Sequence, residues 1–209
     1  MLGIEPFDKY PYKYDRWFIK NKFTYQSELL ALKAQIPHNR HSIEIGVGSG
    51  RFARPLDIKL GVEPSIKMQM LSKKRKIDLV NSVAEKLPFK SSVFELVLIV
   101  TTICFVDNIE LSFKETFRVL KKDGFLIVGF IDRNSSIGKL YEQSKQSNVF
   151  YKFANFYSVN EVIILLEDAG FKDFIFSQTL FQPLNTIKKI EPYRKGYGKG
   201  SFVVIKAKK

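Results

Sequence analysis

"SIEIGVGSGRF", residues 42–52, is a short apolar segment that leads into three alternating glycines and then an arginine. Glycine loses more backbone freedom on folding than any other residue, so this run predicts a backbone that passes very close to another group. The dinucleotide fingerprint is Gly-x-Gly-x-x-Gly, but Arg51 stands where its third glycine would be. The Gly-Lys-Ser/Thr of a P-loop does not follow either. The loop therefore disfavours a dinucleotide pyrophosphate as its ligand.

Strand and helix signals alternate on both sides of this loop. The segment 94–100, FELVLIV, is a continuous apolar run typical of a parallel strand covered on both faces. Ser158 and Glu161 fit a capping box at the start of another helix, and Gly170 predicts its end. We expect strands at 42–45, 58–62, 77–80, 94–100, 125–131, 171–180 and 201–207, and helices at 14–19, 25–35, 51–56, 65–73, 109–120 and from 158. The pattern predicts an α/β, doubly wound sheet that ends in an antiparallel pair of strands.

The composition limits the class of protein. Hydrophobic residues make up 45% of the 209-residue chain, which excludes a disordered chain, and the length suits one domain or one domain with a small lid. We expect no signal peptide and no membrane span, since no apolar run approaches roughly 18 residues. Cys104 is the only cysteine, so we expect no disulfide framework and no metal site, and a reducing cytoplasm is the simplest location.

The net charge of +13 makes a nucleic acid one candidate partner, because a basic surface attracts polyanions. The densest basic run, 73–76, lies at the expected end of a helix, where cations interact favourably with the helix dipole. A lysine-rich, solvated surface therefore explains the charge better than a nucleic-acid interface.

Two further features narrow the class of ligand. Glu63 follows the second expected strand, where a carboxylate can accept hydrogen bonds from both hydroxyls of a ribose. The segment 83–89, VAEKLPF, lies in the loop after the third strand, at a place suited to lining an adenine pocket. Both loops open at the carboxyl edge of the sheet, where ligands bind in doubly wound folds.

With these features the sequence resembles the class I S-adenosylmethionine-dependent methyltransferases, specifically the methyltransferase type 11 (UbiE-like) family. The matching segments lie in the family's order within residues 42–131, and they are IEIGVGSGRF, GVEPSIKM, AEKLPF, FELVLIVTTICFVDN and ETFRVLKKDGFLIVGF. The resemblance implies a Rossmann-like, seven-stranded mixed sheet of order 3-2-1-4-5-7-6, with strand 7 antiparallel and helices on both faces. It also implies S-adenosylmethionine as the cofactor and S-adenosylhomocysteine as the product.

The resemblance further implies roles for particular residues. Glu63 would hold the ribose, and Glu44 would orient the amino group of the cofactor, directly or through water. The methionine part would lie against Gly46, Gly48, Gly50, Thr101 and Thr102, and the adenine against Pro64, Met68, Ala84 and Glu85. Tyr14, in the segment YDRWF, would close over the cofactor. Residues 1–36 are thus expected to form a helical lid and residues 37–209 the catalytic domain, with 133–157 as a substrate cap.

The mechanism is expected to proceed without a histidine base. His38 and His41 both precede the first strand, at the amino end of the sheet, whereas the active site should lie at the carboxyl end. Methyl transfer from a sulfonium is an in-line displacement that depends largely on proximity and orientation. If a base is needed, the candidates are Asp132, Tyr141 and Tyr14.

The favoured acceptor is a small molecule, and two alternatives stay open. An RNA-modifying methyltransferase would explain the basic surface, but residues 101–104, TTIC, lack the Asn/Asp-Pro-Pro-Tyr/Phe motif that holds a flipped base. The other alternative is a protein that binds the cofactor without catalysis.

Overall fold

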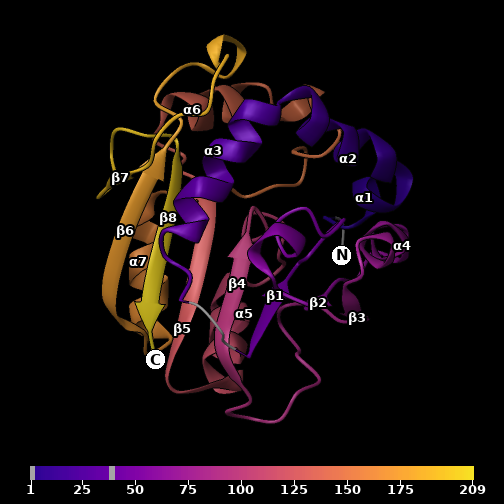
Figure 1. The fold of residues 1–209 in the computed structure, drawn as a ribbon, viewed down its shortest axis with the longest axis vertical. Coiled ribbons are helices and arrows are strands. Elements are labelled where there is room, and N and C mark those ends of the chain that lie inside the picture. Colours follow the sequence, from indigo (N-terminus) through magenta and orange to yellow (C-terminus); the bar gives the residue numbers. More distant parts are fainter. Residues whose placement is uncertain (1–2, 38–40) are drawn as a thin grey trace.

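The computed structural model describes residues 3–37 and 41–209, and its central element is an eight-stranded sheet (Figure 1). The strands are β1 (Ser42–Ile45), β2 (Leu60–Val62), β3 (Asp78–Val80), β4 (Phe94–Val100), β5 (Leu120–Ile131), β6 (Lys172–Thr179), β7 (Arg194–Lys195) and β8 (Phe202–Lys208). Their order is β3-β2-β1-β4-β5-β8-β6-β7. The first five in this order are parallel, and β8 is antiparallel to both β5 and β6. The predicted order is confirmed, with β8 as the seventh strand and the two-residue β7 extending the edge beside β6.

Helices cover both faces of the sheet. They are α1 (Glu5–Lys9), α2 (Pro11–Lys20), α3 (Lys22–Lys33), α4 (Ile66–Lys74), α5 (Ile109–Val119), α6 (Ser136–Gln143) and α7 (Val159–Asp168), with short 3-10 turns η1 (Arg54–Leu56), η2 (Lys145–Ser147) and η3 (Leu184–Thr186). None of the helices in the described part of the chain is long and apolar enough to cross a membrane.

The alternation of side chains along β4 produces two cores. Val97 and Ile99 belong to the core that α5 and α7 cover, whereas Leu96 and Leu98 belong to the core on the opposite face, under α3 and η1. All four side chains are at most 2% exposed, which explains why this strand has no polar face.

The segment after the glycine loop differs from the prediction. A helix was expected over 51–56, but the chain forms turns followed by the three-residue η1. Pro55 lacks a backbone N–H, and Asp57 adopts a left-handed conformation with φ 56°, so an α-helix neither forms nor continues there. The crossover from β1 to β2 is consequently tight, which keeps the glycine loop close to β2.

Two helical regions are longer than expected. α2 begins at Pro11 and α3 at Lys22, and α1 precedes both. Proline is favoured at the first helical position because a backbone N–H, which proline lacks, would be unpaired there anyway.

Within 133–157 the chain forms α6, whose N-cap Ser135 side chain accepts a hydrogen bond from the Gly138 N–H at 3.0 Å. The predicted capping box of α7, from Ser158 to Glu161, is confirmed.

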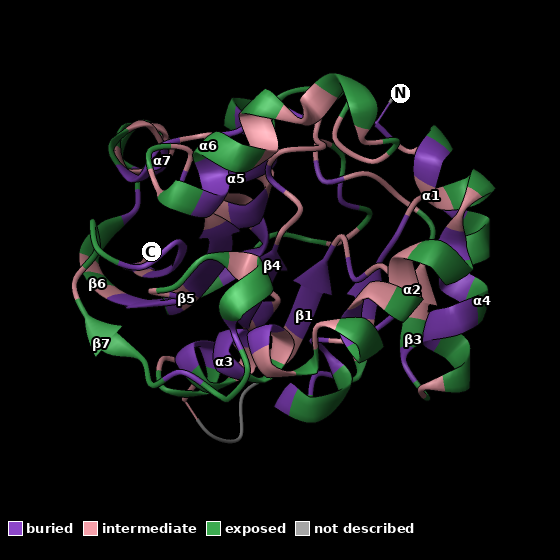
Figure 2. Cartoon of the chain, turned by 90° about the horizontal axis from the view of Figure 1, so that it is seen from above, coloured by how far each residue is buried: buried purple, intermediate pink, exposed green. Residues whose placement is uncertain are grey.

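Three of the helices gather at one end of the sheet. α1, α2 and α6 lie beyond the carboxyl ends of β1 and β4, at the top of Figure 1. Seen from that end, β1 and β4 are buried among the helices, whereas β7 is exposed at the edge (Figure 2). The loops at the carboxyl ends of the parallel strands thus lie between the sheet and the N-terminal helices.

Candidate active site

A cavity lies at the carboxyl ends of the first four parallel strands. It encloses about 710 Å³, including the space at its open mouth. We call it the first cavity, and its lining residues are Gly3, Ile4, Phe7, Tyr14, Gly46, Gly48, Val62, Glu63, Pro64, Met68, Ser82, Val83, Ala84, Glu85, Thr101, Thr102, Phe105, Val106 and Asp107. Most of the predicted cofactor residues are therefore brought together around one space.

The glycine loop forms the floor of this cavity. A Cβ added at Gly48, whose φ is 55°, would lie 3.5 Å from Met68 Cε and 3.9 Å from Tyr14 Cε1. The absent side chain thus leaves the backbone open to the space between these two residues. At Gly46 an added Cβ would lie 2.3 Å from the Thr102 side chain, and the Thr102 hydroxyl donates to the Gly46 carbonyl at 3.2 Å. The loop is therefore fitted to the end of β4 on one side and open on the other.

Glu63 is fixed at the wall by backbone hydrogen bonds. Its Oε2 accepts from the Gly48 N–H at 2.8 Å, and its Oε1 accepts from the Ser65 N–H at 2.9 Å. Burial raises the pKa of Glu63 to about 7; these two hydrogen bonds oppose that rise, and the charge of Asp8 adds to it. Since each carboxylate oxygen can accept more than one hydrogen bond, Glu63 retains capacity for ligand hydroxyls.

Glu85, one of the residues predicted to border the adenine, is joined to the loop after β4. The four residues predicted to border the adenine all line the first cavity, and they are Pro64, Met68, Ala84 and Glu85. Glu85 Oε1 accepts hydrogen bonds from the backbone N–H groups of Asp107, at 2.8 Å, and Asn108, at 3.1 Å. This carboxylate holds the loop 82–85 against the start of α5.

Two predicted cofactor residues do not line the cavity. Glu44 is 1% exposed and lies on the face of β1 opposite Ile43 and Ile45, because side chains alternate along a strand. Burial raises the pKa of Glu44 well above its ordinary value, and its Oε2 has no hydrogen-bond partner among the described residues. Gly50 faces α4, where an added Cβ would lie 2.7 Å from Ser72 Oγ. Gly50 thus permits close packing on α4, which is the role of the third glycine in the dinucleotide fingerprint.

A second cavity adjoins the first. It encloses about 1550 Å³, including its open mouth. Its lining residues are Lys13, Tyr14, Trp17, Phe18, Glu28, Phe52, Thr101, Ile103, Cys104, Phe105, Phe130, Ile131, Tyr141, Ser144, Ser147, Asn148, Val149, Phe150, Tyr151, Phe156, Tyr157 and Leu184. Tyr14, Thr101 and Phe105 line both cavities and form the wall that they share.

The shared wall contains a strained residue and a buried phenol. Thr101 has a φ of 49°, a conformation that is an outlier for a β-branched residue and that occurs mostly where the surroundings require it. Its backbone N–H donates to the Gly129 carbonyl at 2.8 Å, so the strain is held by the neighbouring strand. Burial raises the pKa of Tyr14 well above its ordinary value, and a hydrogen bond with Thr101 opposes this. The raised pKa favours the protonated form of the Tyr14 phenol at this wall.

The other proposed bases are placed differently. Tyr141 lines the second cavity, where burial raises its pKa to about 12 and the charge of Glu28 adds to the rise. Asp132 lines neither cavity, and its Oδ1 accepts a hydrogen bond from the Asn134 N–H at 3.0 Å. His41 is exposed at the amino end of β1, with Nδ1 3.1 Å from the Val93 carbonyl, and His38 is outside the described residues.

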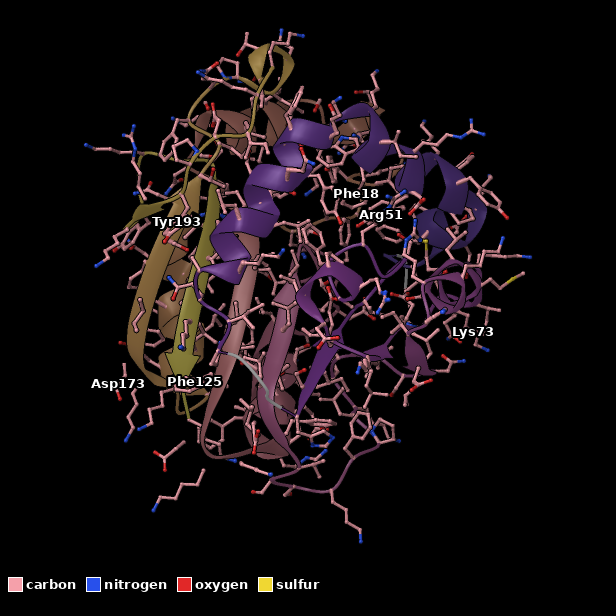
Figure 3. All side chains as sticks on the ribbon, viewed as in Figure 1. Phe18, Arg51, Lys73, Phe125, Asp173 and Tyr193 are labelled. Carbon is pink, nitrogen blue, oxygen red and sulfur yellow. The ribbon has the colours of Figure 1, made fainter. Side chains whose placement is uncertain are left out.

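Sequence reasoning missed several parts of the site. Phe7, from α1, lines the first cavity, and its ring packs edge-on against Tyr14 at 5.2 Å between centroids. Arg51 was noted only as a departure from the dinucleotide pattern, but it points toward α2, where its guanidinium carbon lies 5.7 Å from the centre of the Phe18 ring (Figure 3). The Glu-Pro pair before Phe7 is a helix-start signal that could have predicted α1.

This arrangement defines a class of protein. A doubly wound sheet with its seventh strand antiparallel, a glycine loop after β1 and a buried acid after β2 are the features of class I methyltransferases. A family model described as "Methyltransferase domain" matches residues 43–128. The chain belongs to the S-adenosylmethionine-dependent methyltransferase family, and its cofactor is S-adenosylmethionine.

Known proteins similar to the chain come from several organisms. A crystal structure of a SAM-dependent methyltransferase from Thermotoga maritima, described as a possible histamine N-methyltransferase, is 47% identical, covers 99% of each chain and has a TM-score of 0.96. An uncharacterized protein of Methanocaldococcus jannaschii is 46% identical over 97% of this chain and 98% of its own length. A SAM-dependent methyltransferase from Archaeoglobus fulgidus, 16% identical, shares the fold with a TM-score of 0.70 over 96% of this chain and all of its own.

Proposed function

We propose that the chain transfers a methyl group from a cofactor in the first cavity to a small molecule in the second. The observation that carries this proposal is the wall of Tyr14, Thr101 and Phe105, which belongs to both cavities. These three residues border the junction of the two cavities. A donor in one cavity and an acceptor in the other would meet at this junction, in a space largely lined by protein. The description of the Thermotoga maritima relative names a small molecule, histamine, as its possible acceptor, and this supports the same class of acceptor here.

The residues around the first cavity suit the parts of S-adenosylmethionine. The backbone at Gly46 and Gly48 has the open surface that a methionine tail needs, and the Glu63 carboxylate can accept from the ribose hydroxyls. Glu44, whose Oε2 lacks a partner among the described residues, would act on the amino group through water. The remaining contacts would come from Thr101 and Thr102 to the methionine part and from Pro64, Met68, Ala84 and Glu85 to the adenine, with Gly50 supporting the loop from behind.

When bound, the cofactor supplies a methyl carbon that bonds to a lone pair of the acceptor while its bond to sulfur breaks and the electron pair stays on sulfur. The chain contributes chiefly orientation, which can account for much of the acceleration of such a displacement. Tyr14 and Tyr141 stay protonated at neutral pH, since burial raises the pKa of both phenols. Neither they nor a histidine would remove a proton, so the acceptor's lone pair would be available before transfer.

Two segments would enclose the reactants. Residues 1–36 contribute Phe7, Tyr14 and Glu28 to the cavities, and 133–157 contributes Tyr141 and Phe150. The Phe7 and Phe150 rings lie 5.5 Å apart, so the two segments meet above the glycine loop. We assign the first segment as the lid and the second as the substrate cap of a catalytic domain at 37–209.

A crystal grown with S-adenosylhomocysteine tests this assignment. We expect the adenosine against Glu63, Pro64 and Met68, and the sulfur atom at the shared wall, facing the second cavity. A ligand whose sulfur faces solvent, away from Tyr14 and Thr101, would contradict the proposed path of the methyl group.

A further inference from the structure

The second cavity contains a buried acid, Glu28, that has no partner among the residues that the structure describes. Glu28 lies in the middle of α3, is 4% exposed and lines the cavity. No hydrogen bond or ion pair joins its carboxylate to any residue in 3–37 or 41–209. Burial alone raises the pKa of Glu28 to about 8. The carboxylate thus lies at the surface of the cavity without a compensating contact from any described residue.

Two other buried acids of the chain are compensated by backbone hydrogen bonds. Glu63 accepts two backbone hydrogen bonds, and Glu191 accepts one from the Phe181 N–H. Burying a charge is costly unless it is paired, so an unpaired acid has to be explained by something other than folding. Because Glu28 faces a cavity rather than packed side chains, a cationic ligand is the partner that would compensate it.

The walls around Glu28 suit the same ligand. Trp17, Phe18, Phe130, Tyr141, Tyr151 and Phe156 surround the space with aromatic rings. Aromatic faces attract an ammonium group through their electron-rich surfaces and also bury an apolar body. The other charged residue of the lining, Lys13, is exposed, and its Nζ lies 5.9 Å from the Tyr10 ring centre. The buried part of the cavity therefore carries one acid among aromatic rings.

We propose that Glu28 binds a cationic nitrogen of the methyl acceptor, which makes the acceptor a small amine with an apolar or aromatic body. The methyl group goes to a different atom of the acceptor, one that keeps its lone pair. This rests on the proposed function, since it places the acceptor in the second cavity. Glu28 does not line the first cavity, so it takes no part in holding the cofactor. It is a specificity-determining residue that selects ammonium over neutral or anionic molecules of the same shape.

Matched probes test the charge preference in the wild-type protein. Phenethylamine and tryptamine would be titrated calorimetrically in the presence of S-adenosylhomocysteine, each beside its neutral counterpart, 2-phenylethanol or tryptophol, and beside phenylacetate. We expect at least one amine to bind about tenfold tighter than its alcohol, the size of a charge-assisted contact, and phenylacetate to bind more weakly than either. Equal binding of amine and alcohol, tighter binding of the alcohol, or no saturable binding of either amine would overturn the proposal.

Variants locate the preference. Glu28→Gln keeps the shape of the side chain and removes its charge, so it should abolish the tenfold preference for the amine. Glu110→Gln, which changes an exposed glutamate of α5 outside both cavities, should retain it. A preference that persists in Glu28→Gln would overturn the proposal.

Two readouts separate this proposal from its alternatives. If Glu28 only held the fold together, Glu28→Gln would unfold at a lower temperature than wild type, and that result would overturn the proposal. We expect it to unfold at the same or a higher temperature, because the free-energy cost of burying an acid at this position is gone. Binding of S-adenosylhomocysteine to Glu28→Gln should equal that to wild type. Failure of wild type to bind S-adenosylhomocysteine would count against the proposed function, whereas the amine preference measured without it would still test Glu28.

Discussion

The guanidinium of Arg51 donates two hydrogen bonds to the carboxylate of Asp15, with Nε–Oδ1 and Nη2–Oδ2 distances of 2.9 and 2.7 Å. Arg75, at the end of α4, donates two more to Asp15, at 3.0 and 2.9 Å, and a third to the Ser49 carbonyl at 2.7 Å. One carboxylate of α2 thereby joins the glycine loop and α4. The residue that takes the place of the third dinucleotide glycine ties α2 to the glycine loop.

Replacement of Asp15 by Asn should loosen this junction. Two partly buried guanidinium groups would lose their charged acceptor, so we expect the free energy of unfolding at neutral pH to fall by about 2 kcal/mol. Urea denaturation followed by circular dichroism measures the change. Asp168→Asn is the control, because Asp168 is exposed at the end of α7, and it should leave stability nearly unchanged.

The difference in stability between wild type and Asp15→Asn should depend on pH. Burial raises the pKa of Asp15, but hydrogen bonds from Arg51 and the charge of Arg75 outweigh this and bring it from 3.8 to about 2. A lowered pKa stabilises the fold above the ordinary value, and this contribution disappears as the pH falls through the lowered one. The stability difference between wild type and Asp15→Asn should therefore vanish toward about pH 2. A difference that stays constant through this range would contradict the ion-pair explanation.

Glu63 should make cofactor binding pH-dependent. Its pKa is about 7 in the empty protein, and ribose hydroxyls donate to the ionised carboxylate. The affinity for S-adenosylhomocysteine should accordingly rise by up to about tenfold between about pH 6 and about pH 8, with release of a proton on binding. Calorimetry at both pH values, in two buffers of different ionisation enthalpy, measures both effects. Glu63→Gln should bind more weakly and without this pH dependence; an unchanged pH profile in the variant would exclude Glu63 as its origin.

The Tyr14 ring should matter more to cofactor binding than its hydroxyl. The ring lies over Gly48 and packs against Phe18 and Phe150, with centroid distances of 5.3 and 5.8 Å. Tyr14→Ala should weaken binding of S-adenosylhomocysteine about tenfold through lost apolar contact, whereas Tyr14→Phe should stay within about twofold. Tyr12→Ala, on the exposed side of the same helix, is the control and should bind as wild type. An equal loss in Tyr14→Phe and Tyr14→Ala would instead assign the effect to the hydroxyl.

The sheet was predictable because its strands carry their own signal. β4 is apolar at every position except Glu95, and the capping box and terminal glycine of α7 are local patterns of a few residues. The cofactor cavity followed from the same logic, since parallel strands end at one edge. α1 has only five residues, too few to show helical periodicity, so its Glu-Pro start is the one signal that could have predicted it.

The second cavity could not be read from the sequence. Its walls come from segments as far apart as Lys13 and Leu184, and only the folded chain brings them together. The contact of Asp15 with Arg51 spans 36 positions and that with Arg75 spans 60, so no local pattern reports either pair. Nothing in the sequence marks Glu28 as a cavity residue either, because a glutamate within a helix normally faces solvent.

Direct titration of S-adenosylhomocysteine into the wild-type protein and into Gly48→Val tests the central claim, that the first cavity holds the cofactor. The valine would fill the space between Met68 and Tyr14, and circular dichroism would confirm that the variant is folded. We expect saturable binding at one site per chain in wild type and a loss of at least about a hundredfold in affinity in Gly48→Val. Absence of binding to wild type, or equal binding to a folded Gly48→Val, would contradict the assignment of this cavity.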